Sequence, residues 1–79
     1  MSHMLAQTIG STAWEARTRA GLTRAQVAEA IGLAPLAYER LERGRLLPSV
    51  PTLYRLAQVL HIATDLLVGL DSCTPGLKP

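Results

Sequence analysis

The chain has 79 residues, of which 48% are hydrophobic and 18% charged, and its net charge is +2. This length suits one domain, and the apolar fraction is too high for a disordered chain. No segment reaches the roughly 20 apolar residues of a membrane helix, and the first residues lack the basic and apolar regions of a secretion signal. We therefore expect a cytoplasmic protein that does not enter a membrane.

Catalytic and metal-binding patterns are missing from the sequence. Cys73 is the single cysteine, so the sequence forms no internal disulfide. His3 and His61 stand alone, without the spacing of metal ligands and without a partner for nucleophilic catalysis. We expect no enzyme activity, no metal and no cofactor.

Three segments are distinguished by composition. Residues 1–4 contain a second Met and are interpreted as a cloning remnant. Residues 5–70 form the expected folded domain. Residues 71–79 contain Ser, Thr, two Pro and one Gly, and we expect a flexible tail there.

Helices are the only regular elements that the sequence predicts, because no segment alternates apolar and polar residues as a strand does. Gly21, Gly32 and Gly44 are expected to end the first three helices, while Thr23 and Ser49 are expected to cap the second and the fourth. The expected helices cover residues 5–20, 24–31, 35–43, 50–60 and 64–69. Gly10 is expected to fray or bend the first of them.

Apolar spacing also predicts which side chains are buried. The second helix should bury Val27, Ala28 and Ile31, and the third should bury Tyr38 and Leu41. We interpret Trp14, like Tyr38, as a packing residue. In the last two helices the expected core residues are Leu53, Leu56, Ala57, Leu60, Ile62 and Leu67.

Residues 24–43 have the organisation of a helix-turn-helix, in which two short helices are joined by a tight turn that contains glycine. This unit presents its second helix to the surroundings. A single short helix is narrow enough to enter the major groove of DNA. Seven of the eight basic residues are Arg and lie between Arg17 and Arg55, which permits binding to a polyanion.

The sequence resembles the lambda-repressor and Cro type of helix-turn-helix, the large family also named after the xenobiotic response element. The resemblance covers about residues 9–68. It rests on Gly21-Leu22-Thr23-Arg24, Val27-Ala28, Ile31-Gly32-Leu33, Leu41-Glu42-Arg43-Gly44, Pro48-Ser49 and residues 53–60, in this order and spacing. The resemblance implies an all-α, compact five-helix domain that binds palindromic DNA operators as a dimer and regulates transcription, with repression as the expected outcome.

The resemblance also implies roles for individual residues. Arg24, where the family usually has Gln, would contact a DNA phosphate at the start of the second helix. Arg17 and Glu42 would form an internal ion pair between the first and third helices. The remaining residues of the expected DNA-binding surface are Ala34, Pro35, Leu36, Glu39, Arg40, Arg43 and Arg45.

The expected base-reading helix departs from the family pattern. Ala34 replaces the usual Ser or Thr cap, and Pro35 and Leu36 replace residues that commonly donate hydrogen bonds to bases. Arg40 is the side chain best suited to read a base, since a bidentate Arg–guanine pair contributes about 1–3 kcal/mol. Leu36 can pack on a thymine methyl group.

Several surface residues have a second interpretation. The outer arginines can be solvated side chains paired with neighbours, as Arg43 with Glu39. The leucines Leu36, Leu46 and Leu47 can bind a protein partner, which makes a protein-interaction module the alternative function, or they can be scattered surface residues. Leu66, Val68 and Leu70 leave the expected core face and are assigned to a homodimer interface, with packing against another part of a longer parent chain as the alternative.

Overall fold

The computed structural model describes residues 2–68, and within that range the side chains of 4–64, 67 and 68. All regular elements in this part of the chain are helices, which confirms the all-α prediction. They are α1 (Ser2–Ala20), α2 (Arg24–Ile31), α3 (Pro35–Glu42), α4 (Val50–Leu60) and the single turn α5 (Thr64–Val68). None of these helices is both long and apolar enough to cross a membrane.

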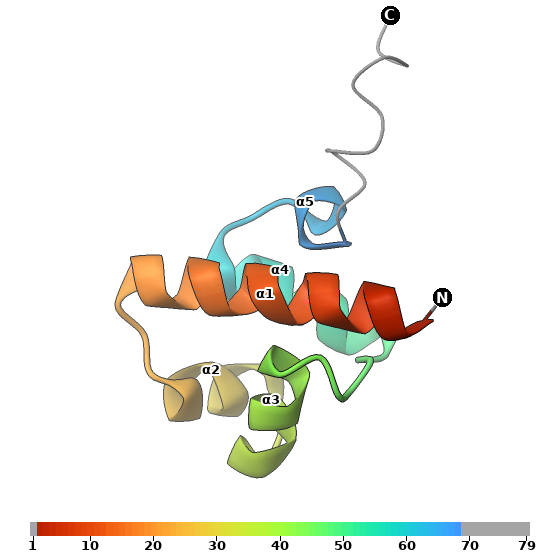
Figure 1. Cartoon of the computed structure of the whole chain (residues 1–79). Coiled ribbons are helices and arrows are strands. Elements are labelled where there is room, and N and C mark those ends of the chain that lie inside the picture. Colours follow the sequence, from red (N-terminus) through yellow and green to blue (C-terminus); the bar gives the residue numbers. More distant parts are fainter. Residues whose placement is uncertain (1, 69–79) are drawn as a thin grey trace, which may run out of the picture.

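Helix α1 crosses the middle of the molecule in Figure 1 and contacts α3, α4 and α5. On one side lie α2 and α3, which pack against each other. On the other side lies α5, whereas α4 runs behind α1 in this view, and both α4 and α5 contact α1. Helix α2 also contacts α4. This arrangement leaves the α2–α3 pair projecting from one side of the body.

The helix boundaries follow from the capping residues that the sequence predicted. Thr23 accepts a hydrogen bond from the Gln26 amide, and the Gln26 side chain accepts one from the Thr23 amide in return. Ser49 caps α4 by accepting a hydrogen bond from the Thr52 amide. The glycines that follow the first three helices all have positive φ, at Gly21, Gly32 and Gly44.

The N-terminal end of α1 differs from the prediction. Helix α1 begins at Ser2 rather than at Leu5, inside the segment interpreted as a cloning remnant. No Gly or Pro stands between Ser2 and Leu5, so nothing in the local sequence breaks the helix there. The expected tail, residues 71–79, lies outside the described residues.

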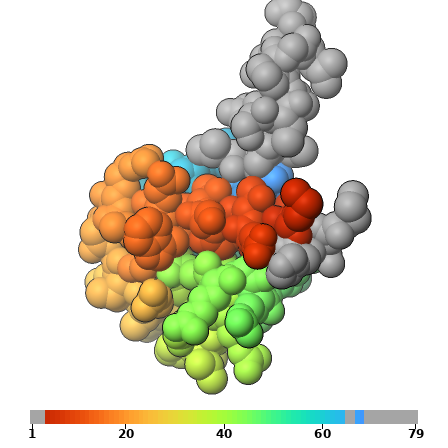
Figure 2. Space-filling view, viewed as in Figure 1, coloured from red at the N-terminus to blue at the C-terminus, as the bar shows by residue number. Residues whose placement is uncertain are grey.

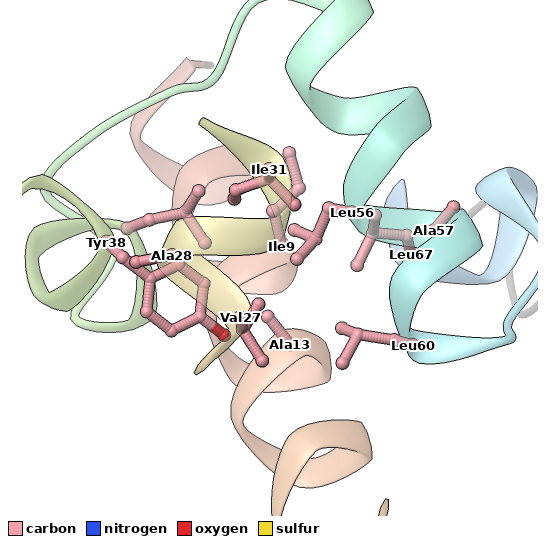
Figure 3. Packing of buried hydrophobic residues seen from close by; sticks show 11 residues of the cluster. Ile9, Ala13, Val27, Ala28, Ile31, Tyr38, Leu56, Ala57, Leu60 and Leu67 are labelled. Atoms are coloured by element: carbon pink, nitrogen blue, oxygen red, sulfur yellow. The ribbon is translucent and has the colours of Figure 1, made fainter. Parts of the chain in front are cut away.

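The core is a single cluster to which α1, α2, α3, α4 and α5 all contribute (Figure 3). Tyr38 and Leu41 of α3 are completely buried, as predicted. The other predicted residues Val27, Ala28, Ile31, Leu56, Ala57, Leu60 and Leu67 are buried as well, with Leu53 and Ile62 packed at the edge of the cluster. The prediction for Trp14 was wrong, since its side chain is half exposed on α1. Trp14 lines a surface hollow on α1 together with Ser11, Glu15 and Glu42.

Gly10 neither frays nor bends α1; it lies buried in an unbroken helix against the C-terminal end of α3. A Cβ atom at this position would lie 2.5 Å from the Leu41 carbonyl oxygen and 2.7 Å from that of Glu42. Gly44 makes a similar approach from the other side, where a Cβ atom would lie 2.9 Å from Cγ of Gln7. The absence of two side chains therefore sets the distance between α1 and the end of α3.

This close contact predicts that Gly10→Ala destabilises the fold although Ala favours a helix. The gain in helix propensity is about 1 kcal/mol, whereas the new methyl group meets backbone atoms that belong to another helix and cannot turn aside. We expect a net loss of about 1–2 kcal/mol in the free energy of unfolding. Thermal unfolding followed by circular dichroism would measure it.

The control is Ser11→Ala at the next, exposed position of α1, which should leave the midpoint unchanged or raise it slightly. A Gly10→Ala variant that is more stable than the parent chain would show that α1 and α3 can separate without cost.

Candidate functional site

Helices α2 and α3 are joined by a turn of three residues, Gly32, Leu33 and Ala34. Gly32 takes the left-handed conformation at φ 78°, and the Leu33 amide donates to the Ala28 carbonyl at 2.9 Å. Ala34 is the N-cap residue of α3, and its side chain makes no capping hydrogen bond. Pro35 occupies the first turn of α3, where its missing N–H costs nothing. The result is a helix-turn-helix whose second helix is rigidly connected to the first.

Helix α3 is buried along one side and open along the other. Tyr38 and Leu41 face the core, and Leu36 is 64% exposed. Pro35, Arg40 and Arg43 are also exposed, and Glu39 is half-buried. The structure therefore places these residues on the outward face that the sequence predicted. In Figure 2 the green segment that contains α3 forms the lower end of the molecule.

The structure brings Arg17 and Glu42 together as the resemblance implied. Arg17 Nε donates to Glu42 Oε2 at 2.6 Å, and Arg17 Nη2 donates to Oε1 at 3.3 Å. The Arg17 Nη1 group also donates to the Leu22 carbonyl at 2.9 Å, in the connection between α1 and α2. One guanidinium group thus joins α1, the loop after it and the end of α3.

A second arginine binds the same carboxylate. Arg24 Nε, at the start of α2, donates to Glu42 Oε1 at 3.0 Å. Sequence reasoning assigned Arg24 to DNA and missed this contact. The sequence carried one signal for this contact: Arg24 stands where the family usually has Gln, and only the cationic side chain forms an ion pair with a carboxylate. The Glu42 side chain is only 3% exposed, whereas that of Arg24 is 50% exposed.

The charges around Glu42 shift its protonation equilibrium. Burial alone raises the pKa of the Glu42 carboxyl, but the hydrogen bonds from Arg17 and Arg24, together with the neighbouring Tyr38 hydroxyl, outweigh burial and hold the pKa below its ordinary value of 4.5. The hydrogen bond to Glu42 raises the pKa of the Arg17 guanidinium. Burial raises the pKa of the Tyr38 hydroxyl, and the Glu42 carboxylate beside it acts in the same direction. That hydroxyl is enclosed and makes no hydrogen bond of regular geometry.

The remaining arginines of the expected surface differ in their pairing. Arg43 Nη2 lies 2.9 Å from Glu39 Oε2, one turn earlier on α3, in an exposed pair. Arg40 and Arg45 form no ion pair with any residue that the structure describes. The Arg45 amide donates to the Arg40 carbonyl at 2.9 Å, so the turn through Gly44 fixes where the chain leaves α3.

The three leucines of the expected protein-binding surface do not form one exposed group. Leu36 and Leu47 are exposed, by 64% and 47%. Leu46 packs against the core instead, which corrects the sequence interpretation. Two further exposed apolar residues, Val50 and Tyr54, lie on α4.

Of the three residues assigned to the dimer interface, Val68 is the one whose side chain the structure describes. This side chain is half-buried and packs against the core, because α5 lies across both α1 and α4 and has two covered sides. Leu66 belongs to α5, but its side chain is not described, and Leu70 lies outside the described residues.

Comparison with known proteins agrees with this geometry. Residues 15–67 match the helix-turn-helix family model, so the match spans α2 to α4 together with parts of α1 and α5. The chain belongs to the helix-turn-helix family, and its resemblance to the lambda-repressor and Cro type is confirmed. It is 39% identical over 67 residues to a protein of Sinorhizobium fredii, the uncharacterized HTH-type transcriptional regulator y4dJ. That alignment covers 85% of this chain and 87% of the relative. No solved structure matches the chain.

The buried position of Glu42 predicts that Glu42→Ala destabilises the protein far more than Glu39→Ala. Loss of the carboxylate leaves the largely buried Arg17 without its partner, at an expected cost of about 3–5 kcal/mol. The exposed Glu39–Arg43 pair should contribute less than about 1 kcal/mol. Urea titrations of the two variants measure the difference. Equal midpoints would show that the ion pair does not hold α1 and α3 together.

Stability should also depend on pH through Glu42. Because its pKa is lower in the folded than in the unfolded chain, the carboxylate contributes its full stability above pH 4.5 and loses it as the pH falls through the folded-state value. The difference in unfolding free energy between the parent chain and Glu42→Gln should therefore shrink on acidification below pH 4.5. Urea titrations at neutral and acid pH would measure this, and a constant difference would contradict it.

Proposed function

We propose that this chain binds double-stranded DNA in a sequence-specific manner and acts as a transcriptional regulator, with repression as the outcome. The lambda-repressor-like five-helix domain would place α3 in the major groove. Membership in the helix-turn-helix family supports this proposal, as does the description of the Sinorhizobium fredii relative as a transcriptional regulator. A cytoplasmic location, with the protein on the nucleoid when bound, follows from the same function.

The observation that carries the proposal is the outer face of α3. It combines a solvent-exposed short helix with Arg40, which has no ion-pair partner among the described residues, and with Arg45 just beyond the helix. Arginine is suited to this surface because its planar fork binds guanine or phosphate through two parallel hydrogen bonds. Helix α3 stands on the side of the body that neither α4 nor α5 covers (Figure 1).

The residues divide into two roles. We assign Arg40, with Leu36 beside it, to base contacts in the major groove. We assign Arg24, Arg43 and Arg45 to phosphates, which position the protein on the duplex without reading sequence. Ala34, Pro35 and Glu39 complete the surface that faces DNA. Since Arg43 is paired with Glu39, its contact requires that this exposed pair opens, at a cost of about 0.5 kcal/mol.

A homodimer on a palindromic operator is part of the proposal. Two copies of α3 would then enter successive major grooves about 34 Å apart. The assigned contact involves Leu66 and Val68 of α5 together with Leu70, which lies outside the described residues. Val68 is already half-covered by its own core and would contribute only its exposed part.

The alternative is a protein-interaction module on the same scaffold. The exposed Leu36 and Leu47 favour it, whereas the inward position of Leu46 reduces the apolar surface available. Salt separates the two functions. DNA binding weakens steeply with salt because counterions are released, and an apolar protein contact does not.

The test is selection from a pool of random duplex DNA at near-physiological salt, with Arg40→Ala in parallel. We expect a palindromic motif in the parent chain and, in the variant, loss of preference at one base pair in each half-site, with a cost of about 1–3 kcal/mol.

Arg19→Ala is the matched control. It removes the same charge from an exposed position that faces α4 and the loop after it, away from α2 and α3. Its motif should be unchanged. If the parent chain selects no motif and is retained only weakly, α3 does not read bases and the leucine surface becomes the site to test with protein partners.

A further inference from the structure

The carboxylate of Glu42 binds two guanidinium groups of different exposure. Arg17 is 12% exposed and ties α1 to α3. Arg24 is 50% exposed and lies on the surface of α2. An exposed ion pair of this kind contributes little stability, so the Arg24 contact requires another explanation.

We propose that Glu42 is a positioning residue for DNA, one that holds the Arg24 guanidinium by its Nε atom so that its two terminal nitrogens face a phosphate group. This inference rests on the proposed function, because it assigns a phosphate of double-stranded DNA as the ligand.

The atoms in contact support this assignment. Glu42 Oε1 accepts from Arg24 Nε, and among the described residues the Nη1 and Nη2 groups of Arg24 make no hydrogen bond. The guanidinium is planar, so fixing one edge also fixes the direction of the terminal pair. A pair of parallel N–H donors matches the oxygens of a phosphate.

The anchor itself is rigid. Glu42 is the last residue of α3, its side chain is almost fully buried, and Arg17 holds it through two hydrogen bonds. Its backbone lies against Gly10 of α1. A long arginine side chain normally loses much rotamer freedom when it binds a ligand. Here that freedom is already reduced in the free protein, which lowers the cost of binding phosphate.

The three charges sum to one positive charge, which the exposed Arg24 presents. Removing the Glu42 carboxylate would leave two arginines and should by charge alone strengthen binding to a polyanion. If Glu42 orients Arg24, its removal must weaken binding instead. The effect of charge and the effect of positioning therefore predict opposite changes in DNA affinity when the Glu42 carboxylate is removed.

The experiment measures the affinity of Glu42→Gln, Arg24→Gln and the double variant for a mixed-sequence DNA duplex, as a function of salt. A mixed sequence suffices because a phosphate contact does not depend on the operator. We expect Arg24→Gln to lose roughly tenfold in affinity, as for one charge-assisted hydrogen bond, and to lower the salt slope by about 0.9. Glu42→Gln should also weaken binding, and it should have no further effect when Arg24 is already replaced.

Two controls separate this role from a structural one. All variants are compared at a temperature where they are folded, as judged by the fluorescence of Trp14, which lines a surface hollow together with Glu42. Glu15→Gln removes a carboxylate from the same hollow without touching Arg24, and it should not weaken binding. Arg24→Lys keeps the charge but has no fork, so it should recover only part of the affinity.

The outcomes are distinct. Glu42→Gln that binds as tightly as the parent chain, or more tightly, overturns the inference and leaves the proposed function standing. The same result follows if Glu42→Gln weakens binding equally with and without Arg24. A parent chain that shows no salt-sensitive binding to any duplex overturns the proposed function itself.

Discussion

The carboxylate of Glu42 is the interaction on which the position of α3 depends. It lies almost fully buried at the end of that helix and accepts hydrogen bonds from arginines on α1 and α2. Burying a charge in this way costs free energy unless the charge is fully paired, so the three elements must meet at one point. An apolar core alone would allow α3 to slide or turn by small amounts. The charged contact gives it one position.

Close packing between α1 and the end of α3 also fixes the position of α3. The missing side chain of Gly10 lets α1 touch the backbone of Leu41 and Glu42, and Gly44 admits Gln7 where α3 ends. Tyr38 (Figure 3) and the equally buried Leu41 hold the inner side of α3 in the core. The outer side then remains free for recognition, carried by a helix of only eight residues that would not be stable in isolation.

The arginines around α3 differ in their burial and in their ion-pair partners. Arg17 is structural, Arg24 lies half exposed on the structural carboxylate, and Arg43 has an exposed partner on its own helix. Arg40 has no ion-pair partner among the described residues. If the chain binds DNA as proposed, each ion pair that must open on binding subtracts from the affinity that the charge supplies. Residues of one type, within a short stretch of sequence, therefore differ in environment because of their partners.

The sequence by itself determined the helical class, the five predicted capping and helix-ending positions, and the inward faces of α2 and α3. These features depend on contacts within a few residues: Thr23 with Gln26, glycine at a positive φ, and apolar side chains at helical spacing. Its agreement with the family pattern also identified Arg17 and Glu42 as partners, although 25 residues separate them.

The tertiary structure alone decided the features that depend on how helices approach one another. Gly10 is a close-packing site rather than a weak point of α1. Trp14 is half exposed instead of buried, and Leu46 packs against the core instead of lying on the surface. Arg24 shares the carboxylate of Glu42 with Arg17. Helical periodicity shows which side of a helix is apolar. It does not show how close the next helix comes or which distant charge shares a partner, because both are set by packing between elements far apart in the chain.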